Sequence, residues 1–94
     1  MSIRALRTLI SVHTHGSFRL SAEAEHLTPA AISQQMRNLE ASLKLQIFER
    51  SQRTPKLTEV GLSLVSEASM VIAAYDGLAD KVRSDNDISG NLIL

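Results

Sequence analysis

The sequence predicts a mainly α-helical fold class: a winged helix-turn-helix of three helices and a short two-stranded wing, followed by a long dimerisation helix. Three observations carry this prediction. Apolar residues recur at helical spacing in three short segments, two of these segments are joined by a very short turn, and a fourth apolar stripe continues for almost three heptads. The predicted domains are 1–58 for the winged helix-turn-helix, with the motif itself at about 18–37, then 59–84 for the linker helix and 85–94 for a hinge.

The first two helices are defined by the residues that separate them. Residues 3–13 carry apolar side chains at the spacing of one helix face, and Gly16 ends that helix. Ser17 is a good N-cap for a shorter second helix over residues 18–25, in which small side chains allow a close approach to a neighbour. Because only His26 and Leu27 connect it to the next helix, the pair is typical of a helix-turn-helix.

The third helix, over residues 28–43, is the most informative segment of the chain. Thr28 is a suitable N-cap and Pro29 suits the first helical position, where no backbone N–H is needed. The apolar stripe that predicts its buried back consists of Ile32, Met36, Leu39 and Leu43. The opposite face is small and polar, with Ala30, Ser33, Gln34, Arg37 and Asn38. Such a face can enter a DNA groove and reach base edges and phosphates.

A basic hairpin is predicted after the third helix. Two short apolar segments, 45–48 and 57–58, flank a polar stretch over residues 50–56 that contains a proline and three cations. We interpret this stretch as a wing, with Arg53 at its tip and Arg50 on its flank, where both can meet the DNA backbone.

The final helix is predicted to be long, because its apolar stripe outruns the small domain. The residues assigned to dimerisation are Leu64, Ala68, Val71, Tyr75, Leu78 and Val82. The alternative is that this stripe packs within the chain against the first helix; self-association is favoured because the stripe is too long for that. Residues 85–91 break the helix, and Leu92 to Leu94 resemble the start of a strand, so we expect a hinge leading into a further domain.

Charge divides the chain at residue 56. The formal net charge is zero, yet residues 1–56 hold eight Lys or Arg against four Asp or Glu, whereas residues 57–94 hold two against six. The first part is therefore a basic module that can approach phosphates, and the acidic extension has another role.

Composition argues against several other classes of protein. Apolar residues make up 44% of the chain, which favours a folded core over disorder, and there is no cysteine for disulfides or Cys-ligated metal. His13, His15 and His26 lack partners that would complete a metal site, and no phosphate loop, catalytic carboxylate pair or activated nucleophile is evident. We therefore expect no metal, no membrane partner and no enzyme. A cytoplasmic location is expected, since no uninterrupted apolar stretch of about 20 residues and no signal peptide is present.

The motifs, taken in order, resemble the N-terminal domain of LysR-type transcriptional regulators over about the first 61 residues. They are Leu6, Leu9, Val12, Gly16-Ser17-Phe18, Ala22-Glu23, Thr28 to Gln35, Leu39-Glu40, Ile47 to Arg50 and Leu57 to Gly61. The resemblance implies a winged helix-turn-helix, a linker helix paired antiparallel with that of a second subunit, and tetramers at full length. It also implies a small-molecule effector bound only by a C-terminal domain absent from these residues, with no cofactor in this chain.

The resemblance also implies which residues meet DNA. Pro29, Ala30, Ser33 and Gln34 lie where family members meet bases and nearby phosphates, Arg50 and Arg53 lie at the wing, and Arg19 and Arg37 are further candidates for phosphate contacts. Position 34 is often arginine in the family, so Gln34 shifts the expected preference from guanine toward adenine. Pro29 stands where glutamine is common, and Glu25 stands where a buried leucine is usual.

The predicted function is sequence-specific binding of promoter DNA by a homodimer, through the recognition helix 28–43 and the wing 50–56. The alternative is a winged-helix module that binds another protein without recognising a DNA sequence. Salt-sensitive affinity for random duplex discriminates between them, because neutralised phosphates release counterions.

Overall fold

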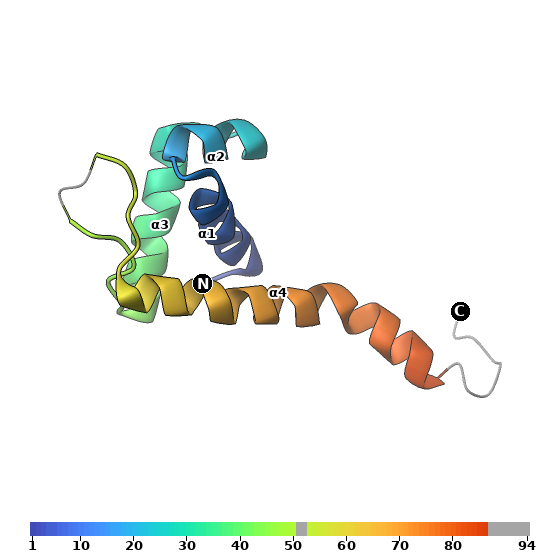
Figure 1. Ribbon diagram of the computed structural model, residues 1–94. Coiled ribbons are helices and arrows are strands. Elements are labelled where there is room, and N and C mark those ends of the chain that lie inside the picture. The colour runs from blue at the N-terminus through green and yellow to red at the C-terminus, as the bar shows by residue number, and fades with distance from the viewer. Residues whose placement is uncertain (51–52, 87–94) are drawn as a thin grey trace.

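The computed structural model describes residues 1–50 and 53–86, and this part of the chain forms four helices. They are α1 (Ile3–His15), α2 (Phe18–Glu25), α3 (Pro29–Leu43) and α4 (Glu59–Asn86). Helices α1, α2 and α3 gather at one end of the molecule, while α4 passes beneath them and projects away (Figure 1). The predicted order of three short helices and one long helix is confirmed.

Each short helix begins at a capping side chain. The hydroxyls of Ser2, Ser17 and Thr28 accept the backbone N–H groups of Ala5, Leu20 and Ala31, over 3.0–3.1 Å. Helix α1 ends later than predicted, at His15, where Gly16 takes a left-handed backbone with φ of 76°. The ends of α2 and α3 are also left-handed, although His26 and Lys44 are not glycines. The cap at His26 begins the short turn between α2 and α3.

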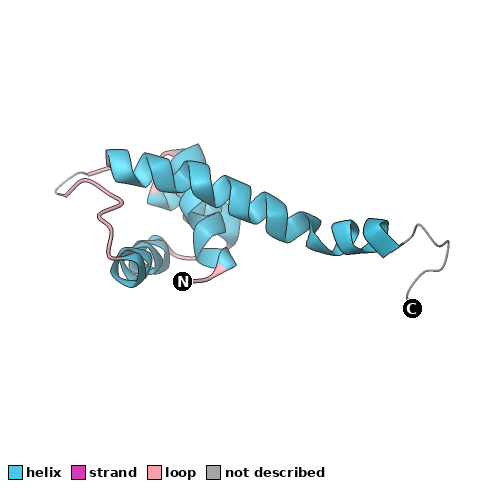
Figure 2. Ribbon diagram, turned by 90° about the horizontal axis from the view of Figure 1, so that it is seen from below, coloured by secondary structure: helices cyan, strands magenta, loops and turns pink. Residues whose placement is uncertain are grey.

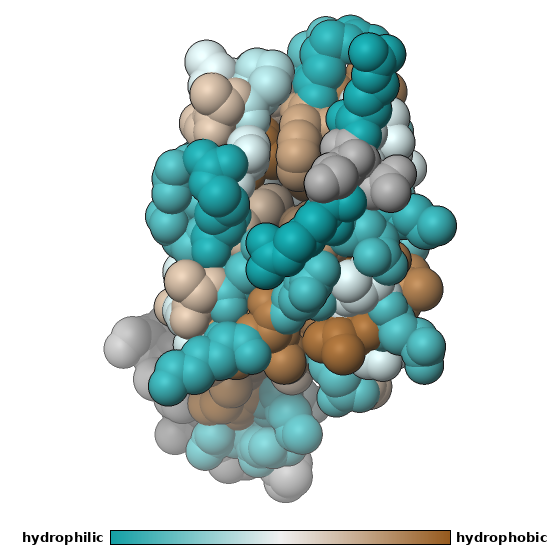
Figure 3. All heavy atoms as spheres, turned by 90° about the vertical axis from the view of Figure 1, so that its left-hand side faces the viewer, coloured by the Kyte–Doolittle hydropathy of each residue, from teal (hydrophilic) through white to brown (hydrophobic). Residues whose placement is uncertain are grey.

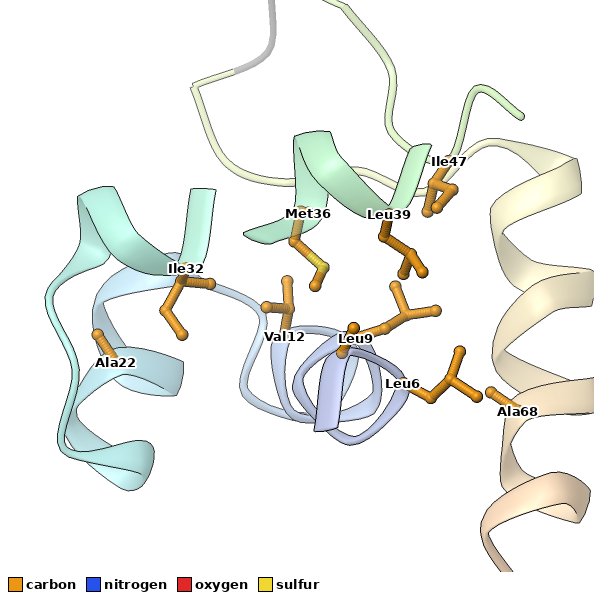
Figure 4. Close-up of a cluster of buried hydrophobic side chains, with 10 residues drawn as sticks. Leu6, Leu9, Val12, Ala22, Ile32, Met36, Leu39, Ile47 and Ala68 are labelled. Carbon is orange, nitrogen blue, oxygen red and sulfur yellow. The ribbon is translucent and has the colours of Figure 1, made fainter. Parts of the chain in front are cut away.

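The core lies where α3 crosses α1. Ile32, Met36 and Leu39 are buried, and they point from α3 toward Leu9 and Val12 of α1 (Figure 4). The apolar stripe predicted for the third helix is thus its buried face, apart from Leu43, which is half-buried at the edge of the core. Burial of one stripe leaves the opposite face of α3 outward.

A polar cluster joins α2 to α1 beside this core. Thr8 and Ser21 are fully buried, and their hydroxyls donate to the Glu25 carboxylate over 2.7 and 3.3 Å. The Ser21 hydroxyl also lies 2.9 Å from that of Ser11. Glu25 therefore accepts hydrogen bonds from two buried hydroxyl groups, one on each helix.

The segment predicted as a two-stranded wing is paired more sparsely than expected. Its base has one antiparallel bridge, between Phe48 and Leu57, flanked by hydrogen bonds from Glu49 N to Lys56 O and from Thr58 N to Ile47 O. Among the described residues this pairing does not extend into strands. Residues 51–52, within the predicted wing 50–56, lie outside the described residues.

The apolar contacts of helix α4 with the domain come from its first half. Ala68 is 1% exposed and faces Leu6 of α1 (Figure 4), so this predicted dimerisation residue belongs to the core of the protomer. Leu64 is also partly covered by the core, as are Val65 and Ile72. An ion pair between Arg7 and Asp76 ties α1 to α4 farther along. The packing alternative therefore holds for the first half of the helix.

The second half of α4 extends away from the other helices (Figure 2). Val71, Tyr75, Leu78 and Val82 are 47–58% exposed. Helix α4 continues to Asn86, past the predicted break at 85, and the rest of the predicted hinge lies outside the described residues. By length and composition alone α4 could cross a membrane, with a mean hydropathy of 1.2 in an 18-residue window, although one such helix is weak support for a span.

Gly61 lies at the junction of α4 with the wing base. A Cβ at this position would lie 2.2 Å from the Ile47 carbonyl oxygen, a separation that side-chain carbons do not tolerate. Thr58 completes the junction, since its hydroxyl donates to Gln46 O over 2.6 Å and accepts from Gly61 N over 2.9 Å. The absence of a side chain at 61 therefore lets α4 start directly against the wing base.

Replacing Gly61 with alanine tests this close approach. We expect Gly61→Ala to destabilise the domain by about 1–3 kcal/mol or more, because the backbone of the wing base must move. The matched control is Gly77→Ala on the same helix, where an added Cβ meets nothing within 4 Å. The control should be stabilising by about 0.5–1 kcal/mol, as expected for glycine in a helix. Urea unfolding at one protein concentration measures both, and equal effects would contradict the junction.

Candidate nucleic-acid interface

The outward face of α3 presents the residues that the sequence singles out. Pro29 and Ala30 are exposed in its first turn, Gln34 and Arg37 are exposed one and two turns later, and Ser33 is half-buried between them. Because the buried stripe of the same helix is locked into the core, this face has a fixed direction. Seen from the side of the wing, hydrophilic side chains cover much of the surface (Figure 3).

Hydrogen bonds link the polar side chains of this face. Arg37 donates from Nη1 to Ser33 Oγ over 2.8 Å and from Nη2 to Gln34 Oε1 over 2.7 Å. Gln34 Nε2 in turn donates to Asn38 Oδ1 over 2.9 Å. All partners are neutral, so the charge of Arg37 is not compensated within the network. The four side chains form one connected polar surface, which we call the α3 network.

The α3 network is suited to exchanging its internal bonds for external ones. Its hydrogen bonds are exposed to water, and such bonds contribute little net stability because water replaces them readily. Gln34 uses both its carbonyl oxygen and its amide nitrogen, the two groups that a glutamine needs for a bidentate contact with adenine. A bidentate contact made by Gln34 would break both of its bonds and leave Arg37 with Ser33 as its remaining partner.

The wing is held beside α3 by a side chain that the sequence analysis did not single out for this role. Glu40 Oε2 accepts the backbone N–H groups of Ile47 and Phe48, over 2.8 and 3.1 Å. The Phe48 ring packs edge-on against Phe18 of α2, with ring centres 5.9 Å apart. Glu40 belongs to the Leu39-Glu40 pair, one of the motifs that carry the family resemblance, and this pair is the sequence signal that could have identified it. The α3 carboxylate therefore anchors the start of the segment that bears Arg50 and Arg53, both exposed.

The structure does not join every predicted residue to this surface. Arg19 on α2 forms an exposed ion pair with Glu23 over 2.9 Å, so its charge is balanced locally. Asn38 belongs to the α3 network, although it was not among the predicted contact residues.

Within residues 1–50 and 53–86, no group of three His, Asp or Glu side chains could hold a metal ion.

Fold and site together define a helix-turn-helix protein with a wing base and a projecting helix. Residues 3–62 match the family model described as bacterial regulatory helix-turn-helix protein, lysR family. The chain belongs to this family.

Relatives and solved structures agree with this assignment. An uncharacterised HTH-type transcriptional regulator of Azotobacter vinelandii is 33% identical over 95 residues, which cover all of this chain and 66% of that protein. The transcriptional activator AllS of Salmonella typhimurium is 39% identical over 82 residues, covering 87% of this chain and 27% of that protein. The chain thus spans less than two thirds of these relatives.

Two solved structures resemble most of this chain. The complex of the CbnR DNA-binding domain with DNA has a TM-score of 0.83 at 29% identity, covering 90% of this chain and 98% of that one. The complex of the BenM DNA-binding domain with benA site 1 DNA has a TM-score of 0.81 at 27% identity, covering 89% and 94%.

Removing the Glu40 carboxylate tests the anchoring of the wing. We expect Glu40→Ala to lower the free energy of unfolding by about 1.5–3 kcal/mol, because two backbone N–H groups lose a charged acceptor. The control Glu67→Ala, at an exposed position on α4, should stay within about 0.5 kcal/mol of the parent. Amide hydrogen exchange should also accelerate at Ile47 and Phe48 in Glu40→Ala. Unchanged protection there would show that the carboxylate does not hold the wing.

Proposed function

We propose that this chain is the DNA-binding part of a transcriptional regulator and binds promoter DNA as a homodimer. The observation that carries the proposal is the α3 network, which is polar, exposed and presented by a helix whose other side is locked into the core. Two similar domains, of CbnR and BenM, were solved as complexes with DNA, which supports the same use of this face.

In the proposed complex, α3 enters the major groove. Gln34 exchanges its two internal bonds for the N6 and N7 edge of an adenine, while Ala30 meets a thymine methyl group and Ser33 and the Pro29 turn approach the adjoining bases and phosphates. Arg37, released from Gln34, turns to a phosphate. Base contacts of this kind specify the sequence, whereas the phosphate contacts set position and most of the salt-dependent affinity.

The wing supplies the second set of contacts. Its base is placed by Glu40 and by the Phe48–Leu57 bridge, and its two arginines, Arg50 and Arg53, extend toward flanking phosphates or the minor groove. We propose that the two arms pair as short strands beyond the bridge in the complex. Arg19 contributes only if its ion pair with Glu23 opens, an inexpensive step for an exposed pair.

The exposed face of α4 would be covered by a second subunit. Val71, Tyr75, Leu78 and Val82 follow a helical spacing of four, three and four residues, on a side of α4 that the protomer leaves exposed. This contiguous apolar surface needs a partner, and a second copy of the helix would place two α3 surfaces for a dyad in the DNA. It also accounts for the hydropathy of α4 without a membrane.

The remaining roles concern the longer protein. A regulator of bacterial promoters would act in the cytoplasm, without enzymatic activity, and full-length subunits would form tetramers. A small-molecule effector would bind to a C-terminal domain outside residues 1–94. The competing function, a protein-interaction module, would use the same exposed α4 face but would not give the α3 network a role.

Two substitutions separate reading of the sequence from attraction to phosphate. Gln34→Ala should relax the preference at one base step, at a cost of about 1–3 kcal/mol on the specific site. Arg53→Ala should weaken specific and random duplexes alike and reduce the salt slope by about 1. Fluorescence anisotropy titrations at several salt concentrations measure both. If Gln34→Ala loses the same affinity on both duplexes, or Arg53→Ala weakens only the specific one, these roles are wrong. If the parent shows no salt-sensitive affinity, the interaction-module alternative is favoured.

A charge on the exposed α4 face should dissociate the dimer. Leu78→Asp places a carboxylate where an apolar side chain would be buried by the partner, so we expect monomers at micromolar concentration in sedimentation velocity. The control Ala73→Asp adds the same charge at an exposed site roughly 140° around the helix. It should leave the dimer intact. A parent protein that already sediments as a monomer would contradict the proposed interface.

A further inference from the structure

A basic hollow lies between the second half of α3 and the base of the wing. Its volume is about 450 Å³, and its lining includes Arg37, Lys44 and Arg50 together with one acid, Glu40. It adjoins the α3 network through Arg37 but extends beyond it, past the end of the recognition helix. Lys44 was given no role in DNA contact by the sequence analysis.

The charges in this hollow are unbalanced. Within residues 1–50 and 53–86 neither Lys44 nor Arg50 forms an ion pair, and Arg37 bonds only to neutral side chains. The Glu40 carboxylate is engaged with two backbone N–H groups of the wing base. Three cations around one hollow create a positive potential that attracts an anion.

The backbone at Lys44 adds a second observation. Lys44 ends α3 in the left-handed region, with φ of 57° and ψ of 42°. Glycine is the residue that adopts this conformation without strain, and a side chain with a Cβ carries an energetic cost there. The chain thus places a long, flexible cation at a position where glycine would favour stability.

We infer that Lys44, together with Arg50, binds a phosphate of duplex DNA in this hollow, outside the contacts of the recognition face. The inference rests on the proposed DNA-binding function and extends it to the end of α3. The bound phosphate would lie between α3 and the wing, so its position would couple the placement of the wing to that of α3. The alternative role for Lys44 is purely structural, as a cation near the negative end of the α3 dipole.

Lys44→Gly separates these roles, because it removes the charge and at the same time removes the strain of a side chain in the left-handed backbone region. We expect its melting temperature to rise by several degrees while its affinity for specific and random duplexes falls. The slope of log affinity against log salt should become shallower by about 0.9, the value for one lost phosphate contact. Lys44→Arg keeps the charge and should keep the slope of the parent.

Two further variants control for strain and for net charge. His26 caps α2 in the same left-handed conformation, with φ of 58°. His26→Gly removes the strain there and should raise the melting temperature without changing the slope of log affinity against log salt. Lys81→Gln removes a charge from the exposed second half of α4 and should leave the slope unchanged.

The outcomes distinguish this inference from the function on which it rests. A parent protein without salt-sensitive duplex binding would overturn both. A parent that binds, with Lys44→Gly retaining the full slope, overturns only the phosphate site. A lower melting temperature for Lys44→Gly with an unchanged slope would establish the structural role instead. An equal loss of slope in Lys81→Gln would show that net charge alone is responsible.

Discussion

The contact between Ile47 and Gly61 is the constraint on which the arrangement of the helices depends. The Ile47 side chain is fully buried, its amide is held by Glu40 of α3, and its carbonyl faces Gly61 of α4 at a distance that excludes a side chain. The Ile47 carbonyl also accepts the backbone N–H of Thr58 over 2.9 Å. One residue therefore joins α3, the wing base and α4.

This junction explains how a small domain can hold the outward face of α3 and the base of the wing in one fixed arrangement. Helix α3 is fixed along its buried stripe by α1 and at its end by the wing base, so that the α3 network and the start of the wing at Ile47 and Phe48 keep a constant relation. The Thr8–Glu25–Ser21 cluster fixes α2 against α1 in the same way, through polar groups at a partly buried site. Both links use a carboxylate to satisfy groups that would otherwise be buried without partners.

Local signals in the sequence predict the local parts of this structure. Ser17 and Thr28 have the chemistry of N-caps, and the spacing of Ile32, Met36 and Leu39 specifies one buried face, so the helices and the outward face of α3 could be anticipated. The extent of strand pairing in the wing could not be predicted from the sequence, because it depends on contacts with α3 and α4. The hydrogen bonds of the α3 network depend on side-chain rotamers, which periodicity does not describe.

The helical stripe of α4 shows a different limit. Periodicity marks Ala68 and Leu78 as members of the same apolar face, yet Ala68 is buried against α1 and Leu78 is exposed. The division depends on where the three-helix domain ends in space, which no local pattern encodes. The role of Glu25 could not be predicted for a similar reason, since it depends on the hydroxyls of Thr8 on α1 and Ser21 on α2, which only the packing of the two helices brings together.

The central claim is that paired α3 surfaces, linked by α4 and flanked by wings, recognise a DNA sequence. Selection of bound duplexes from a random DNA pool tests it most directly. The account predicts an enriched site with two inverted half-sites at a constant spacing, each containing an adenine step that becomes degenerate when selection is repeated with Gln34→Ala. Retained duplexes with no shared sequence, or a single half-site without a dyad, would contradict it.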